Sequence, residues 1–272
     1  MVISFPRLNP VTFKKEITSP YEKCTEKFIQ EFDVEDYIVF QLSYDNDFLT
    51  NEIKAYIVDC SGEIILEVGK TTVIINSLMR QDIFRIPCSV IKEGIYNILI
   101  ESPAKFRYYS NTFYIHDASE SLLIQYGCKD NKFDCLFKTI NGAEYFYLRI
   151  AGGVKTQGYS FKSDDVEFID QDRKVTLIDS IPYTIRKYTF GESIGMPIWL
   201  ADKLNRIFAC DDVKINGVKV VKSSGAALEL SSQENYKYVG ATIDLLHTDE
   251  GYSEKPDTIS GIHVEEFTEI FN

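Results

Sequence analysis

The sequence predicts a mainly β protein, with an N-terminal Ig-like antiparallel β-sandwich followed by a second β-rich domain that contains one short α-helix and a hairpin. Three observations predict this class. The 272 residues include 17 Tyr and 18 Phe but only 1 Trp and 3 Met, and Tyr and Phe favour strands. Short apolar segments bounded by turn residues recur roughly every 8–15 positions from residue 37 to 117, which is typical of sandwiches. Only residues 197–209 show the period of an amphipathic helix.

The first half reads as strands joined by turns, without a helical segment between them. Apolar and polar residues alternate in most of these segments, Gly62 marks one hairpin turn, and Pro87 ends another segment. The closing pattern EGIYNILIES…YYSNTFYIHD looks like the final hairpin of many Ig-like domains, but the Cys…Trp…Cys framework of antibodies is missing. We therefore expect a sandwich without an inter-sheet disulfide, with strands at residues 37–44, 53–57, 64–68, 73–75, 83–86, 96–100 and 109–115.

The polar stretch HDASES, residues 116–121, is the best domain boundary. It predicts a first domain with an N-terminal arm at residues 1–117 and a β-rich assembly domain at 118–272. Residues 155–172 are polar and poorly periodic, and we interpret them as a long loop or extended arm, because loops of this length are usually functional or disordered. Strands of the second domain are expected at residues 122–126, 133–137, 144–150, 174–179, 183–190, 213–221, 227–230 and 238–246.

The predicted helix, residues 197–209, begins at a proline, which suits a first helical turn. Its apolar stripe consists of Leu200, Leu204, Ile207 and Phe208, and the stripe leaves Lys203 and Arg206 facing outward. Trp199, the only tryptophan, stands at the helix start. It is interpreted as a core anchor or, alternatively, as an interface anchor.

Asn216-Gly217 predicts a two-residue hairpin turn, because both positions of such a turn need positive φ. The pairing then sets Ile215 opposite Val218 and Val213 opposite Val220 on one buried face. Lys214 and Lys219 oppose each other on the other face, where like charges are tolerated if they are solvated or if an acidic surface meets them. An acidic tail, expected to be flexible unless its apolar residues dock, follows from Asp249.

Charge and hydropathy exclude several classes of protein. There are 41 Asp+Glu against 29 Lys+Arg, a net charge of −12, and such a chain repels phosphate backbones, so specific nucleic-acid binding is not expected. No apolar run approaches the roughly 18 residues of a membrane span, so we expect no membrane insertion. The first 15 residues lack the continuous apolar core of a signal peptide.

No motif predicts a reaction, a cofactor or a metal. The six cysteines show no CxxC pair and lie apart from the three histidines, so a zinc site is not expected. We interpret them as reduced thiols, although Cys128 and Cys135 can meet across a hairpin. The stretch VGKTT lacks the upstream glycine of a phosphate-binding loop. We therefore expect no enzyme and no catalytic residues. The cysteines are Cys24, Cys60, Cys88, Cys128, Cys135 and Cys210.

The second half of the sequence has an order of segments that resembles a known family of proteins. It runs LLIQYGCKDNKFDCLF, then EYFYLRIAGGV, then a polar arm, then FIDQDRKVTLIDSIPYTIRKYTFGESIGMPIWLADKLNRIFACDDVKINGVKVVKSSG. This order of strand, arm, strand, helix and hairpin resembles tail-associated structural proteins of phages that infect Bacteroidetes, including crAss-like phages. The resemblance covers roughly residues 37–245, and its most specific part is 180–221. No catalytic residues belong to the pattern.

The resemblance implies a virion protein, a ring or hub subunit of the tail, made in the host bacterial cytoplasm. Its partners would be copies of itself and neighbouring tail or portal-associated proteins, with DNA passing through a lumen. A receptor- or glycan-binding adaptor is the alternative, because aromatic patches on a sandwich can bind sugars. Residues expected at an interface are Tyr159, Phe161, Phe168 and Ile169 in the arm, with Trp199, Lys214 and Lys219.

Overall fold

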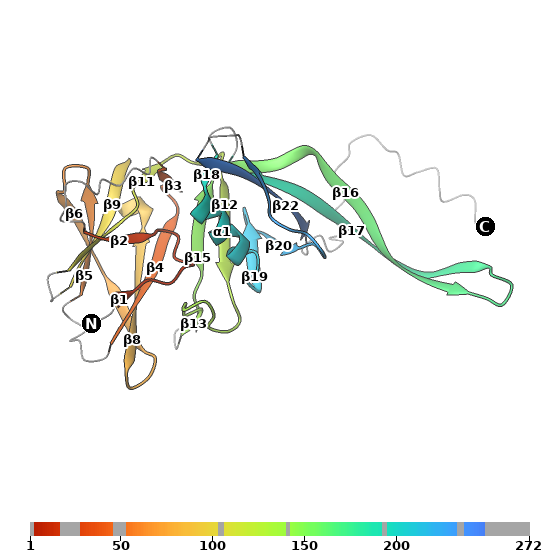
Figure 1. Ribbon diagram of the computed structural model, residues 1–272, viewed down its shortest axis with the longest axis horizontal. Helices are drawn as coiled ribbons and strands as arrows, with labels where there is room; N and C mark the ends of the chain where they lie inside the picture. Colours follow the sequence, from red (N-terminus) through yellow and green to blue (C-terminus); the bar gives the residue numbers. More distant parts are fainter. Residues whose placement is uncertain are drawn as a thin grey trace, which may run out of the picture.

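The computed structural model describes residues 3–16, 28–45, 53–102, 106–139, 142–191, 195–232 and 237–247. These residues confirm the predicted class, because they form mainly antiparallel β-sheets and one α-helix. Figure 1 shows two β-rich bodies side by side along the long axis, with a long hairpin projecting from one end. No helix in the described part of the chain is long and apolar enough to cross a membrane. The predicted acidic tail and Cys24 lie outside the described residues.

The N-terminal body is a sandwich of two sheets around an aromatic core. Phe40 and Phe84 stack with their ring centroids 4.7 Å apart, and Phe32 meets Phe113 edge-on at 5.7 Å. All four side chains are fully buried. One sheet has the order β1 (Ile3–Ser4), β4 (Tyr37–Asp45), β8 (Met79–Pro87), β7 (Lys70–Ile74). The other contains β2 (Phe13–Lys15), β10 (Arg107–Ser110), β9 (Gly94–Glu101), β11 (Phe113–His116), β3 (Gln30–Asp33), β5 (Lys54–Asp59) and β6 (Ile64–Val68).

Three features of the sandwich were not predicted. The segment before residue 37 contributes β1, β2 and β3 to the two sheets. β3 pairs with β11 in parallel, so the second sheet is not purely antiparallel. A short 3-10 helix, Cys88–Val90, follows β8 directly after the proline that ends it.

The second body is one large twisted sheet with the helix packed on it. Its order is β15 (Phe146–Ile150), β12 (Leu122–Gly127), β19 (Asp212–Ile215), β20 (Val218–Lys222), β22 (Tyr238–His247), β17 (Val175–Phe190), β16 (Gly152–Ile169). β18 (Met196–Pro197) and β21 (Glu229–Ser232) also pair with β22, and β13 (Lys138–Thr139) pairs with β14 (Gly142–Ala143). Helix α1 (Ile198–Ile207) buries Leu200, Leu204 and Ile207, as the apolar stripe predicted.

The strand predicted at 133–137 is absent. Phe133 and Asp134 have positive φ values of 56° and 61°, so the chain turns there and only an isolated bridge joins Lys132 to Cys135. Phe133 is exposed, whereas the apolar residues at the end of the segment are buried without being in a strand. Leu136 and Phe137 pack into the core of the large sheet.

A buried polar seam joins the sandwich to the large sheet, and Gln41 on β4 lies at its centre. The Gln41 Nε2 donates to the Leu136 carbonyl, and its Oε1 accepts from the Leu136 N–H, both at 2.8 Å. The Asn9 side chain pairs with the Gln41 backbone at 2.7 and 2.9 Å. Because Gln41 is fully buried, losing one of these partners leaves a polar atom unsatisfied, at a cost of about 1–3 kcal/mol.

A buried ion pair continues the same seam. Arg149 on β15 donates from Nε and Nη2 to the two oxygens of Asp36, at 2.7 and 2.9 Å. The Arg149 Nη1 donates to the Ala118 carbonyl at 2.9 Å. Asp33 accepts from the Ala118 N–H at 2.9 Å. These bonds fix the connection between the sandwich and β12, so the two bodies are held as one unit.

The Asn216-Gly217 turn and its register agree with the sequence. Their φ values are 49° and 82°, and Val213 pairs with Val220 and Ile215 with Val218. A residue of the neighbouring strand β12 also holds the turn, because the Asn216 Oδ1 accepts from the Leu123 N–H at 2.8 Å. Val218 was expected to be buried with the other three, but 37% of it is exposed because it lies next to the turn.

We expect Gly217→Val to destabilise the protein by about 1–3 kcal/mol, because a β-branched residue is strained at φ 82°. Nothing lies within 4 Å of the added Cβ, so the cost is conformational and not steric. The matched control is Gly153→Val, whose Cβ also meets nothing within 4 Å and whose backbone is not left-handed. Urea unfolding measures both, and equal midpoints for the two variants would contradict this reading of the turn.

Candidate assembly surface

The segment expected to be a long loop or extended arm, residues 155–172, forms most of strand β16 and the turn that follows it, so it is extended and paired and is not a loop. β16 pairs antiparallel with β17 from Gly152↔Phe190 to Ile169↔Val175. Among the described residues, β22 pairs with β17 only between Ile185 and Phe190. The remainder projects from the body as a two-stranded ribbon, visible as the long green hairpin in Figure 1. We call residues 159–185 the projecting hairpin.

Local geometry fixes the base and the tip of this hairpin. Gly152 lies so close to the backbone of Thr189 and Phe190 that a Cβ there would collide with the Thr189 carbonyl oxygen. At the tip, the Asp170 Oδ1 accepts from the Lys174 N–H at 2.8 Å, and Arg173 adopts a φ of 64°. The register shifts twice, between Val154 and Tyr159 and between Val166 and Glu167. These shifts break the alternation that identifies strands from sequence.

The projecting hairpin exposes many large apolar side chains. Phe161 is 81% exposed, the highest value among the large apolar residues of the described chain. The four arm residues expected at an interface all lie on this hairpin. The exposed apolar residues of β17, on the other strand of the hairpin, were not predicted from the sequence. The nine side chains, each 47–81% exposed, are Tyr159, Phe161, Val166, Phe168, Ile169, Val175, Leu177, Ile178 and Ile181.

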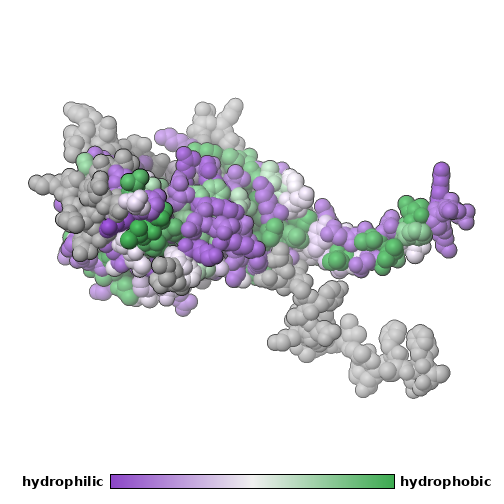
Figure 2. All heavy atoms as spheres, turned by 90° about the horizontal axis from the view of Figure 1, so that it is seen from below, coloured by the Kyte–Doolittle hydropathy of each residue, from purple (hydrophilic) through white to green (hydrophobic). Residues whose placement is uncertain are grey.

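The apolar residues occupy both faces of the ribbon. Residues paired across antiparallel strands share a face. The pairs Asp164↔Ile181 and Phe168↔Thr176 therefore lie on one face. Phe161↔Thr184 and Ile169↔Val175 lie on the other. Figure 2 shows hydrophobic residues alternating with hydrophilic ones along the whole projection. A two-stranded hairpin with water on both faces is marginally stable, and exposed apolar patches mark interaction sites.

Lys214 and Lys219 oppose each other in the β19–β20 pair, as the sequence predicted. The Lys219 Nζ lies 3.8 Å from the Asp212 Oδ1, so an acid of the same chain partly balances the two charges. β20 is separated from β17 by β22 in the sheet order. The two lysines therefore do not form part of the projecting hairpin.

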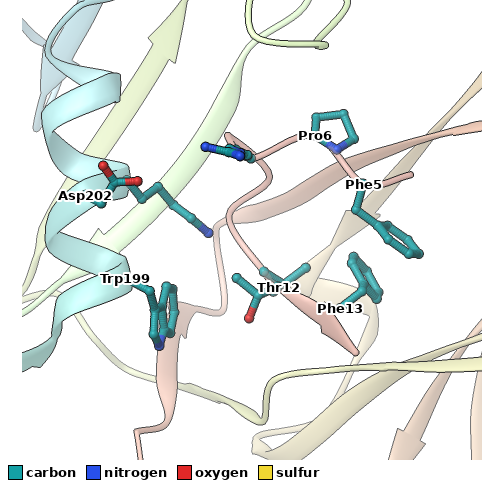
Figure 3. Close-up of a pocket in the computed structure, with 9 residues that line it drawn as sticks. Phe5, Pro6, Thr12, Phe13, Trp199 and Asp202 are labelled. Atoms are coloured by element: carbon teal, nitrogen blue, oxygen red, sulfur yellow. The ribbon is translucent and has the colours of Figure 1, made fainter. Parts of the chain in front are cut away.

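Trp199 lies at a cavity between α1 and the N-terminal segment. The cavity has a volume of about 330 Å³. Figure 3 shows Trp199 and Asp202 on the helix, across the cavity from Thr12 and Phe13. Trp199 is half-buried, and its ring meets Phe28 edge-on at 5.8 Å. Its contacts are therefore with other parts of this chain, in agreement with a packing role.

Lys203 was expected to face outward, but only 3% of it is exposed. It lies three residues after Leu200 and so belongs to the buried face of α1. Its Nζ donates to the carbonyls of Asn9 at 2.5 Å and Pro10 at 2.9 Å. Burial lowers the pKa of Lys203 to about 7. A neutral amine still has two hydrogens, so both bonds to the N-terminal segment persist when the proton is lost.

Lys203 makes stability depend on pH in a defined direction. Its folded pKa of about 7 lies below the unfolded value of about 10.4. The unfolded chain therefore binds more protons between these values, and stability from this residue rises with pH in that window. Relative to Lys203→Met, we expect the wild-type free energy of unfolding to increase by about 1–2 kcal/mol from pH 7 to 8.5. Urea titrations at the two pH values measure this, and parallel pH profiles would contradict it.

A second cavity, of about 440 Å³, lies beside the β13–β14 pair. The Tyr145 hydroxyl donates to the Asp212 Oδ2 at 3.0 Å, and Lys132 pairs with Asp211 at 3.2 Å. Both acids of this part of the wall thus have partners, and the mixture of acidic and basic side chains around the cavity does not favour one kind of ligand.

The five described cysteines are free thiols. The Cys210 thiol donates to the Arg206 carbonyl at 3.7 Å, and burial, with Cys128 nearby, raises the pKa of Cys210. Cys128 therefore has Cys210 as a neighbour, in addition to the predicted Cys135. Among the described residues, no group of three or more His, Cys, Asp or Glu is placed to hold a metal ion.

The comparisons with known proteins do not assign this chain to a family. No family model matches it, and neither the curated proteins nor the solved structures give a match.

Proposed function

We propose that this protein is a non-enzymatic structural subunit that assembles with copies of itself through the projecting hairpin, as a ring or hub component of a phage tail. The observation that carries the proposal is the apolar character of both faces of a ribbon held away from the body. Covering such a ribbon with another protein removes this apolar area from water, which favours association. The resemblance to tail proteins is the reason for placing this assembly in a virion.

The exposed area is of the size that a protein interface needs. At roughly 100 Å² for each of the nine side chains, the hairpin presents about 900 Å², and a standard interface buries about 800 Å² per partner. Ring subunits use heterologous contacts, in which one surface meets a different surface of the next copy. A projecting element at one end of the body suits such a contact. Neighbouring tail or portal-associated proteins are the other partners proposed.

The charged groups buried in this structure support a structural role. Arg149 with Asp36 and Lys203 with two carbonyls each join the sandwich or the N-terminal segment to the large sheet. Lys70 pairs with the fully buried Asp82 inside the sandwich, at 2.9 Å. Each of these groups has a packing role that accounts for its position.

A receptor- or glycan-binding adaptor is the second candidate, and one observation favours it. The cavity of about 330 Å³ combines the rings of Trp199, Phe5 and Phe13 with the charged side chains of Arg7 and Asp202. Aromatic faces beside hydrogen-bonding groups are suited to sugars. Glycan-array binding by wild type that is lost in Trp199→Ala would support this candidate over assembly.

The assembly proposal predicts that the hairpin controls oligomeric state. We expect light scattering after size exclusion to show higher oligomers for the wild type. Replacing residues 161–184 by Asn-Gly, which closes Ser160 to Ile185 with a two-residue turn, should leave the fold intact and yield monomers. In wild type, the hairpin should resist protease in the oligomer and be cleaved in the monomer.

The matched point variants are Phe161→Ser and Val90→Ser. Val90 is 61% exposed but lies in the short 3-10 helix of the sandwich. Only the hairpin variant should weaken the oligomer. A wild type that stays monomeric at all concentrations, with its hairpin protected from protease, would contradict the proposal.

A further inference from the structure

The sandwich carries a second exposed apolar surface, at the loop that joins β7 to β8. Leu78 is 76% exposed and Ile74 is 66% exposed, and Ile75 and Met79 lie beside them in the chain with smaller exposed fractions. Two hydrogen bonds close the loop, since the Ile75 N–H donates to the Met79 carbonyl at 3.1 Å and the Leu78 N–H donates to the Asn76 Oδ1 at 2.8 Å. We call residues 74–79 the β7–β8 loop.

This loop adjoins an open sheet edge. β7 is the last strand of its sheet and pairs only with β8 among the described residues. β17 likewise has a free outer edge before Ile185 in the described part of the chain. Two open edges with apolar side chains can pair by strand addition, in which main-chain hydrogen bonds join the strands and side chains set the register.

The position and charge of the loop favour the projecting hairpin as its occupant. The sandwich and the hairpin lie at opposite ends of the long axis, so the hairpin of one copy can reach the loop only in another copy (Figure 1). Residues 159–185 contain six acidic and three basic residues. Residues 69–81 contain no acidic residue, and of their two basic residues Lys70 is already paired with the buried Asp82 at 2.9 Å, so the strand and loop carry no net negative charge to repel the hairpin. Pairing two hairpins with each other would instead bring acid against acid, which is unfavourable.

We propose that the projecting hairpin of one copy docks on the β7 edge and the β7–β8 loop of the next copy, so that the subunits join head to tail. This inference deepens the proposed function and rests on it. A contact of this kind is heterologous, so it closes into a ring when the rotation per subunit permits and otherwise extends as a filament.

Two variants test the contact from its two sides. The hairpin variant is Phe161→Glu with Phe168→Glu, and the loop variant is Ile74→Glu with Leu78→Glu. All four side chains are more than half exposed, so each variant should keep the wild-type melting temperature within a few degrees. The control is Val90→Glu, an equally exposed apolar position outside both surfaces.

Each variant alone should be monomeric, with a self-association constant weakened at least about tenfold, while the control assembles as wild type. An equimolar mixture of the two variants should give a 1:1 heterodimer by light scattering. The hairpin variant keeps an intact loop and the loop variant keeps an intact hairpin, so one junction forms and cannot propagate.

The outcomes separate this inference from the proposed function. If the hairpin variant is monomeric but the loop variant assembles as wild type, the hairpin docks elsewhere and the inference is overturned, while the proposed assembly stands. If both variants are monomeric but their mixture gives no heterodimer, the two surfaces do not meet and the inference is also overturned. If wild type itself is monomeric at every concentration, both proposals fail.

Discussion

The buried pairing of Gln41 with the Leu136 backbone is the interaction on which the rest of the structure depends. It lies between the sandwich and the large sheet, together with Asn9 and the Arg149–Asp36 ion pair. Polar groups buried in this way are costly unless every partner is present. The seam therefore specifies one relative placement of the two bodies, in a way that an apolar contact of the same area would not.

The large sheet in turn fixes the base of the projecting hairpin. Its base, from Ile185 to Phe190, is paired with β22 inside the large sheet, and the core residues Tyr188 and Phe190 hold that part of β17 in place. The exposed ribbon is thus an extension of a buried strand. Such a ribbon is fixed in direction at its root, so it can present apolar side chains to a neighbour with little loss of conformational entropy on binding.

Much of the fold could be predicted because it follows local rules. Alternation identified most strands of the sandwich, the apolar stripe identified α1, and Asn216-Gly217 identified the β19–β20 turn and its register. The pairing of residues 155–172 as a strand was not predicted, because both faces of the hairpin carry apolar and polar residues and because two register shifts interrupt the period. A strand that is not half-buried has no reason to alternate.

Lys203 was misread for a different reason. Its polarity suggested an outward position, but its spacing from Leu200 places it on the buried face, where carbonyls of the N-terminal segment accept its hydrogens. Partners about 190 positions away in the chain leave no local signal. The same limit applies to the proposed assembly surface, because only the fold shows that the exposed apolar residues of β17 and of the β7–β8 loop lie at open sheet edges.

Hydrogen–deuterium exchange of the full chain, compared between monomeric and assembled fractions, tests the central claim most directly. The account predicts that amides of residues 159–185 and of residues 70–79 become protected together on assembly, while the seam around Gln41 exchanges slowly in both states. Assembly that protects neither segment, or that protects a different surface while both of these exchange as in the monomer, would contradict it.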